Sequence, residues 1–194
     1  SVWWILKELA GRDLLYRGYK SVPYCPRCGT ALSSHEVAQG YKDIEDASLS
    51  FLCALVGEDG RLDPDGRSFL VWTTTPWTLP ANQAVSLNPG FDYVIIQCEG
   101  VAEHEHERLL LAEALLADAV SRYELEDYQI IGRCKGKDLE GLKLQHPFYQ
   151  REVPIIVGDH VTTEAGTGAV HTAPGHGQED YVVGSRYNLK VYNP

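Results

Sequence analysis

Residues 71–82 read Val-Trp-Thr-Thr-Thr-Pro-Trp-Thr-Leu-Pro-Ala-Asn, and the interpretation of the fold starts from this stretch. Its first half is rich in β-branched and aromatic residues, which favour a strand. Pro76 cannot donate to a hydrogen-bonded ladder, so we expect the strand to end there and to leave hydroxyl groups at the rim of a sheet. Because strand side chains alternate, Thr73 and Thr75 face one side and Thr74 the other.

This stretch has two interpretations. Three consecutive threonines can reflect nothing more than strand propensity. Alternatively, the strand end forms part of a pocket, because the indole of Trp77 and the amide of Asn82 follow the hydroxyl groups closely. A pocket for a small ligand that is partly polar and partly apolar combines such groups.

The rest of the chain indicates many short strands and few helices. Alternating or apolar runs predict strands at 35–44, 48–56, 68–75, 91–97, 128–134, 142–145, 153–158 and 168–172, with an exposed hairpin loop at 58–66. Helical spacing predicts an opening helix through Ile5, Leu6, Leu9 and Leu14–Leu15, a helix over 107–123, and a last helix from about Gln178. We therefore expect a mixed, mainly β fold, with a β-barrel or rolled sheet surrounded by a few helices.

Length and composition limit the possible classes of protein. The chain has 194 residues, enough for one domain, and no apolar run long enough to span a bilayer. It contains no Met, even at position 1, so we expect one domain cut from a longer chain, with a junction segment at 1–35 and a barrel core at 36–190. The number of cysteines is odd, five, and the last three, Cys53, Cys98 and Cys134, stand singly, which predicts a reducing compartment rather than a disulfide framework. A net charge of −10 predicts weak binding of nucleic acid by the domain alone.

Residues 166–181 form the second informative stretch and read Gly-Thr-Gly-Ala-Val-His-Thr-Ala-Pro-Gly-His-Gly-Gln-Glu-Asp-Tyr. The glycines and the proline indicate unusual backbone geometry around His171 and His176. Without a functional role, Asp180 is an acidic residue favoured in the first turn of a helix, and His171 is a hydrogen-bonded strand histidine at the surface. A zinc site of His171, His176 and Asp180 is a further alternative, although the spacing matches no standard ligand pattern.

Cys25 and Cys28 form a Cys-x-x-Cys turn, which is half of a zinc knuckle. The sequence holds no second pair, and His35 is a weak candidate for a third ligand. Two free cysteines in a tight turn account for the pattern equally well. A structural zinc domain therefore stays open as an interpretation of this part of the chain.

The two long stretches, in this order and at this separation, resemble the paired signatures of isoleucyl-tRNA synthetase editing domains. Residues 24–37, Tyr-Cys-Pro-Arg-Cys-Gly-Thr-Ala-Leu-Ser-Ser-His-Glu-Val, resemble the junction that enters such a domain, so the resemblance covers nearly the whole chain. Valyl and leucyl relatives typically carry an acidic residue where Trp77 stands, and Lys or Met where His171 stands. The isoleucyl assignment is favoured, with a valyl or leucyl editing domain as the alternative.

The resemblance implies a role for each site residue. Asp180 would bind the α-ammonium of the mischarged amino acid, His171 and the threonines would shape its side-chain pocket, and Trp77 would form an apolar wall. Thr73, Thr74, Thr75 and Asn82 would position the ester and the terminal adenosine. The implied catalytic residues are Thr73, Thr74, Thr75, Asn82, His171 and Asp180, and the implied substrate-binding residues are Trp72, Trp77, Thr78, His171 and Asp180.

The resemblance also implies a substrate and partners. The domain would deacylate valine from the 3′ end of tRNA(Ile), and also cleave valyl-adenylate, as a cytoplasmic or organellar monomer joined to the remainder of its synthetase and to no membrane. Editing would need no cofactor, apart from zinc on Cys25 and Cys28 completed by ligands outside the chain. ATP would belong to the full-length enzyme, because the chain has neither a His-x-Gly-His nor a Lys-Met-Ser-Lys-Ser motif. A catalytically silent module that binds the tRNA 3′ end is the alternative.

The physics of discrimination agrees with a size-selective pocket. Isoleucine exceeds valine by one methylene, so binding alone separates them by about 1–3 kcal/mol, a limit for which the isoleucyl enzyme is itself the standard example. Overpacking a second, smaller pocket by one methylene costs about 1–3 kcal/mol. No Ser-His-Asp or Cys-His arrangement is evident, and a positioned water can suffice for an activated ester. This interpretation requires Thr75 and Asp180 to lie at one site and fails if they lie on opposite sides of the molecule.

Overall fold

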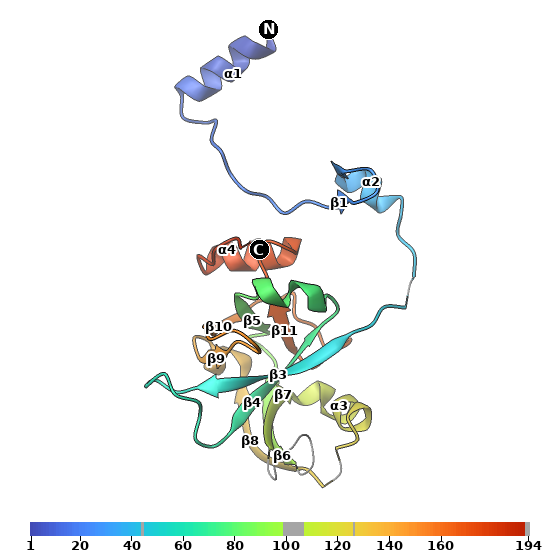
Figure 1. Cartoon of the computed structure of the whole chain (residues 1–194), viewed down its shortest axis with the longest axis vertical. Coiled ribbons are helices and arrows are strands. Elements are labelled where there is room, and N and C mark those ends of the chain that lie inside the picture. Colours follow the sequence, from blue (N-terminus) through green and yellow to red (C-terminus); the bar gives the residue numbers. More distant parts are fainter. Residues whose placement is uncertain (44, 99–106, 126, 193–194) are drawn as a thin grey trace.

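A computed structural model describes residues 1–43, 45–98, 107–125 and 127–192 (Figure 1). The strands are β1 (Tyr24–Cys25), β2 (Thr30–Ala31), β3 (Leu49–Val56), β4 (Arg67–Thr73), β5 (Ala84–Leu87), β6 (Asp92–Cys98), β7 (Glu107–Ala112), β8 (Gln129–Lys135), β9 (Lys143–Gln145), β10 (Glu152–Val157) and β11 (Ala169–Thr172). The α-helices are α1 (Val2–Gly11), α2 (Ser34–Ala38), α3 (Leu116–Arg122) and α4 (Gln178–Arg186). Three 3₁₀ helices are η1 (Pro76–Ala81), η2 (Glu113–Leu115) and η3 (Gly136–Leu139).

Nine strands form one sheet in the order β11-β5-β10-β9-β3-β4-β7-β6-β8. An additional parallel pairing of β11 with β4, at Val170 and Trp72, closes the first six of these strands into a barrel. The first residues of β4, Arg67–Phe69, pair with β7 instead, so β7, β6 and β8 extend from the barrel. The predicted mainly β barrel with a few helices is confirmed.

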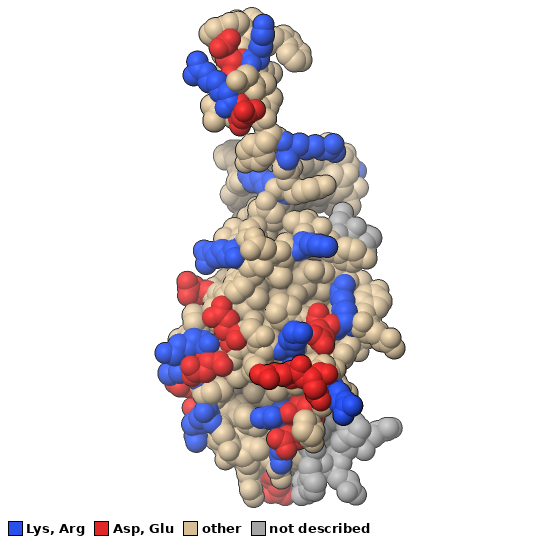
Figure 2. All heavy atoms as spheres, turned by 90° about the vertical axis from the view of Figure 1, so that its left-hand side faces the viewer, with Lys and Arg blue, Asp and Glu red and all other residues tan. Residues whose placement is uncertain are grey.

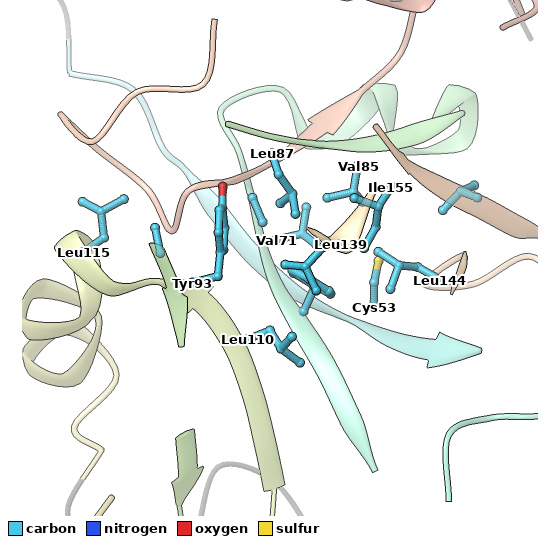
Figure 3. Close-up of a cluster of buried hydrophobic side chains, with 14 residues drawn as sticks. Cys53, Val71, Val85, Leu87, Tyr93, Leu110, Leu115, Leu139, Leu144 and Ile155 are labelled. Carbon is cyan, nitrogen blue, oxygen red and sulfur yellow. The ribbon is translucent and has the colours of Figure 1, made fainter. Parts of the chain in front are cut away.

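The core fills the barrel and continues under the extension. Val71, Val85, Leu144 and Ile155 lie in the main cluster of buried side chains, which Figure 3 shows in close-up. A second cluster packs α3 against the outer face of β6 and β7, and it includes Val94, Ile96, Leu109, Leu111, Leu116 and Ala119. Burial of apolar surface of this kind is the main stabilising contribution to a fold.

Tyr93 connects the extension to the barrel from within the main cluster (Figure 3). Its hydroxyl donates to the Gly168 carbonyl at 2.6 Å and accepts from the Asn88 amide at 3.1 Å. Burial raises the pKa of this phenol well above its usual range. Gly168 has φ +77°, and a Cβ built on it would lie 2.3 Å from the Cβ of Ala112, so only glycine fits where the chain enters β11.

The predicted helix over 107–123 is wrong in its first part, because Glu107–Ala112 form strand β7 and helical structure begins at Glu113. Leu109 and Leu111 face the α3 cluster, whereas Leu110 and Ala112 face the barrel core. A strand buried on both faces is a continuous apolar run, and such a run also satisfies helical spacing. Pairing with β6 and β4 therefore decides the structure here.

The predicted strand at 35–44 is also wrong, because helix α2 starts this segment. Ser33 caps the helix: the Glu36 amide donates to the Ser33 hydroxyl at 3.3 Å, and the Ser33 amide donates to the Glu36 carboxylate at 2.8 Å. This Ser-x-x-Glu capping box was present in the sequence as a helix signal.

The remaining expectations agree with the structure within a few residues. Helix α1 ends at Gly11 and leaves Leu14–Leu15 outside it, the hairpin between β3 and β4 spans the Asp- and Gly-rich loop, and α4 begins at Gln178. Strand β5 was not predicted. The strands of the nine-stranded sheet lie between Leu49 and Thr172. Among the described residues, no helix is long and apolar enough to cross a membrane.

We expect the Tyr93→Phe variant to lose about 1–3 kcal/mol of unfolding free energy, because the buried Gly168 carbonyl and Asn88 amide both lose their partner. Urea denaturation followed by circular dichroism measures this loss. Tyr128→Phe, at an exposed position, is the matched control and should change stability little. Equal midpoints for both variants would contradict a connecting role for Tyr93.

Candidate functional site

The two stretches singled out in the sequence meet where the barrel closes. Trp72 of β4 lies in register with Val170 of β11, and η1 begins directly after β4. Pro76 occupies the first turn of η1, where a missing N–H costs nothing. The Thr78 amide donates to the Thr75 carbonyl at 3.0 Å and starts the turn.

His171 is buried at the centre of this junction, with 4% of its surface exposed. Its Nε2 lies 2.8 Å from the Thr78 hydroxyl, and its Nδ1 lies 2.6 Å from the amide nitrogen of Asn82. His171 lies in β11, Thr78 lies within η1, and Asn82 directly follows η1. Both nitrogens of the imidazole are therefore hydrogen-bonded within the protein.

The hydrogen bonds define the tautomer of His171. The Asn82 side-chain nitrogen also donates to the Ala84 carbonyl at 3.0 Å, which orients the amide so that its second hydrogen points to Nδ1. The Thr78 hydroxyl donates to the Thr75 carbonyl at 2.8 Å and so accepts from the other ring nitrogen. His171 is thus neutral and carries its proton on Nε2. Burial, with smaller contributions from His146 and His176, lowers its pKa to about 4.

The threonines continue the network toward the surface. The Thr73 hydroxyl is buried and accepts from the Thr75 amide at 3.1 Å, whereas Thr74 and Thr75 are exposed. The Thr75 hydroxyl lies 3.3 Å from that of Thr78 and 3.4 Å from that of Thr73. A row of hydroxyl groups therefore leads from solvent to His171.

The two tryptophans of the first stretch differ in environment. Trp72 is half-buried and packs on the backbone of Gly166, where a Cβ would lie 2.7 Å from the indole and where φ is +84°. Trp77 is 69% exposed at the start of η1. An exposed indole of this size beside hydroxyl groups is available for contact with a ligand.

Asp180 lies in the first turn of α4, as the sequence predicted. Its Oδ2 accepts from the Ala173 amide at 2.7 Å, two residues beyond His171. Burial raises the pKa of this carboxyl, and the hydrogen bond from Ala173 partly opposes that effect. Asp180 and the threonine segment thus both contact the end of β11, at residues 171–173.

A zinc site of His171, His176 and Asp180 is not favoured. Both ring nitrogens of His171 are already bonded to protein groups, and the described part of the chain holds no cluster of three or more His, Cys, Asp or Glu that could bind a metal ion.

The Cys25–Cys28 turn connects the paired strands β1 and β2. The Cys28 amide donates to the Cys25 sulfur at 3.3 Å and lowers the pKa of that thiol, and Gly29 has φ +68°.

Sequence reasoning missed two residues that contact this junction. His146 and Arg151, in the turn between β9 and β10, bind backbone carbonyls at the end of η1. The only signal in the sequence was an isolated His-Pro pair followed by an arginine, a pattern without a specific meaning.

Comparison with known proteins gives the class. Residues 62–193 match the family model described as "Leucyl-tRNA synthetase, editing domain", so the chain belongs to this family of aminoacyl-tRNA synthetase editing domains. A solved structure entitled "The crystal structure of GlLeuRS-CP1" matches with a TM-score of 0.57 and 15% identity over 75% of this chain and 66% of that one. The editing domain of the cytosolic leucyl-tRNA synthetase of P. falciparum matches with a TM-score of 0.52 and 18% identity over 64% and 51%. These two likenesses concern the fold.

The curated relatives specify the branch of the family. The isoleucine–tRNA ligase of Methylococcus capsulatus is 51% identical over 97% of this chain and 21% of that protein. The isoleucine–tRNA ligase of Nitrosococcus oceani is 50% identical over 97% of this chain and 20% of that protein. The resemblance to isoleucyl-tRNA synthetase editing domains is confirmed, and the chain spans about a fifth of the length of these relatives.

We expect His171 to destabilise the protein progressively as the pH falls from about 6.5 to about 4, since its pKa is 6.5 in the unfolded chain and about 4 in the folded one. In this window the unfolded chain binds the proton and the folded chain does not, so the contribution of His171 to stability is complete above about pH 6.5, and about 3 kcal/mol has been lost once the pH has fallen to about 4. Urea midpoints measured from pH 7 to pH 4 test this. His171→Gln should show the shallower profile, and the exposed-site control His35→Gln should follow the wild type. Parallel profiles for wild type and His171→Gln would disprove it.

Proposed function

We propose that this chain is a hydrolase that cleaves valine from mischarged Val-tRNA(Ile). The observation that supports this most is the junction itself: a neutral, buried His171 is fixed between Thr78 and Asn82, and the half-buried carboxylate of Asp180 lies at the same strand end. The membership of the chain in the editing-domain family gives this geometry its substrate class.

The reaction requires little of the protein. Water adds to the ester carbonyl, the bond to the ribose oxygen breaks, and valine and a free ribose hydroxyl leave, with the proton of water passing to that oxygen. The hydroxyl groups of Thr74 and Thr75 are exposed at the junction and would orient the water and the ester. His171 is an unsuitable base, because both of its ring nitrogens are already hydrogen-bonded within the protein. Its pKa of about 4 also makes the imidazole a weak acceptor of a proton near neutral pH. We assign to it the wall of the side-chain pocket.

Asp180 is suited to binding an ammonium group. Ala173 occupies its Oδ2, and we assign the substrate ammonium to Oδ1. Burial raises the pKa of the carboxyl, so a cationic partner would stabilise its charged form and be bound in return.

The size of the pocket would supply specificity. Two hydrogen bonds hold the imidazole of His171 in place, so it cannot move aside easily for a larger side chain. An additional methylene in the pocket would therefore cost about 1–3 kcal/mol through overpacking. Hydrolysis of valyl-adenylate at the same site is consistent with the same groups. The second candidate, a silent module that only binds the tRNA 3′ end, would show binding without release of valine.

Most of the binding energy for tRNA would come from the remainder of the parent synthetase. Acidic and basic side chains are interspersed on the barrel face in Figure 2, and the net charge is −10. Helix α1 lies apart from the barrel (Figure 1) with no buried residue, and Trp3 and Trp4 are 81% and 63% exposed. A ten-residue helix has only marginal stability by itself, so we propose that α1 packs against a surface of the parent enzyme. We place that enzyme in the cytoplasm.

Zinc is the one metal that the chain itself suggests. We propose that Cys25 and Cys28 supply two thiolate ligands, because both lie in one tight turn where the Cys28 amide donates to the Cys25 sulfur, and that the other ligands lie in the parent enzyme. Titration of the parent enzyme with a zinc chelator would release one metal equivalent fewer from Cys28→Ser than from wild type. Equal zinc contents would refute this assignment.

We expect the chain to release valine from Val-tRNA(Ile) faster than isoleucine from Ile-tRNA(Ile), roughly ten- to a hundredfold, from the overpacking cost of one methylene. Asp180→Asn should slow valine release by roughly ten- to a hundredfold, because the ammonium loses a charged partner while the amide oxygen still accepts from Ala173. Deacylation of radiolabelled aminoacyl-tRNA measures both rates.

Asp118→Asn, at an exposed position of α3, is the matched control and should behave as wild type. Equal release of both amino acids by the wild-type chain would exclude the size-selective pocket. Binding of the tRNA end with no release of either would favour the silent module.

A further inference from the structure

We infer that His146 and Arg151, in the turn between β9 and β10, are positioning residues that set the geometry of His171 by binding the end of η1. This inference rests on the proposed function, in which His171 forms the wall of the pocket for the amino-acid side chain. Neither residue belongs to the two stretches that carry the family resemblance.

His146 binds η1 through one ring nitrogen and its own turn through the other. It follows β9 directly and is 2% exposed. Its Nδ1 accepts from the amides of Phe148 and Tyr149 at 3.3 and 3.1 Å, so the proton is on Nε2, which donates to the Leu79 carbonyl at 3.0 Å. Burial, with the nearby charge of Arg151, lowers its pKa. The ring is therefore a neutral, fixed donor.

Arg151 binds the next carbonyls of the same segment. Its Nη2 donates to the Pro80 carbonyl at 2.9 Å and to the Asn82 carbonyl at 2.6 Å. The guanidinium also lies over the Tyr149 ring, 5.3 Å from the centroid. The end of a helix leaves such carbonyls without helical partners, and a cation is favoured there.

Two of the bound carbonyls, those of Leu79 and Pro80, lie in the chain between Thr78 and Asn82, the two residues that hold His171. The third is the carbonyl of Asn82 itself. Thr78 directly precedes Leu79, and Asn82 carries both the carbonyl bound by Arg151 and the amide bound to His171. A shift of η1 relative to the β9–β10 turn would therefore move both hydrogen-bond partners of His171 at once. Direct contact of His146 or Arg151 with a substrate is not needed for this effect.

The test measures His171 separately from activity. In the ¹⁵N-labelled chain, two-bond ¹H–¹⁵N spectra report the tautomer of each histidine, and loss of one signal set in His171→Gln identifies His171. We expect wild type to show the Nε2–H tautomer only. Arg151→Met should show a mixture of tautomers, together with a fall on the order of tenfold in the ratio of valine to isoleucine release. Arg151→Lys, which keeps one charged donor, should recover part of both.

Two further comparisons separate positioning from folding. Arg133→Met removes an arginine of β8, outside the barrel, whose Nε donates to Glu113 at 3.0 Å at an exposed position, and it should leave tautomer and selectivity unchanged. Should Arg151→Met fail to fold, His146→Gln and His146→Leu decide, because glutamine keeps a donor for the Leu79 carbonyl and leucine does not. Glutamine near wild type with leucine altered supports the inference.

A single Nε2–H tautomer and unchanged selectivity in a folded Arg151→Met chain, or in both His146 variants, would overturn the inference. If the wild-type chain releases neither amino acid, the proposed function fails by itself. The tautomer spectra then still decide whether His146 and Arg151 position His171.

Discussion

The parallel pairing of Val170 with Trp72 is the contact on which the rest of this molecule depends. It closes six strands into a barrel and brings the end of β11 against η1. His171 is far from Thr78 and Asn82 in the chain and meets them because of this closure. Tyr93 and Gly168 support it from inside, since the tyrosine hydroxyl binds the glycine carbonyl where the chain enters β11. Core packing and site geometry are thus consequences of one pairing.

Burial shifts the pKa values of two ionisable groups at the junction, the buried His171 and the half-buried Asp180, in opposite directions. Burial keeps His171 neutral by lowering its pKa, and burial makes the charged form of Asp180 costly by raising its pKa. Both ring nitrogens of His171 are hydrogen-bonded within the protein, so its imidazole is suited to be a rigid wall of a pocket. The aspartate gains from a cation supplied by a ligand. An aminoacyl ester offers both an apolar side chain and an ammonium group, so a single small substrate can use both environments.

Much of this was accessible from the sequence, and the failures have physical reasons. Pro76 and the threonines located a strand end, and the glycine-rich stretch located β11 and α4, because proline and glycine restrict the backbone locally. Leu109–Ala112 were assigned to a helix since burial on two faces erases the alternation of a strand. His146 and Arg151 could not be found, because their partners are backbone carbonyls, which leave no trace in the identity of the residues they belong to.

Along one edge, strand β4 pairs with two strands in succession. Arg67–Phe69 pair with β7, and Trp72 pairs with β11. This dual use makes the count of residues along β4 as important as their chemistry. A single inserted or deleted residue between Phe69 and Trp72 would exchange inward and outward side chains beyond it, turning Thr73 out of the interior. A change in length is easier to accommodate in a loop, such as the one between β3 and β4, because it leaves the alternation of side chains along β4 unchanged.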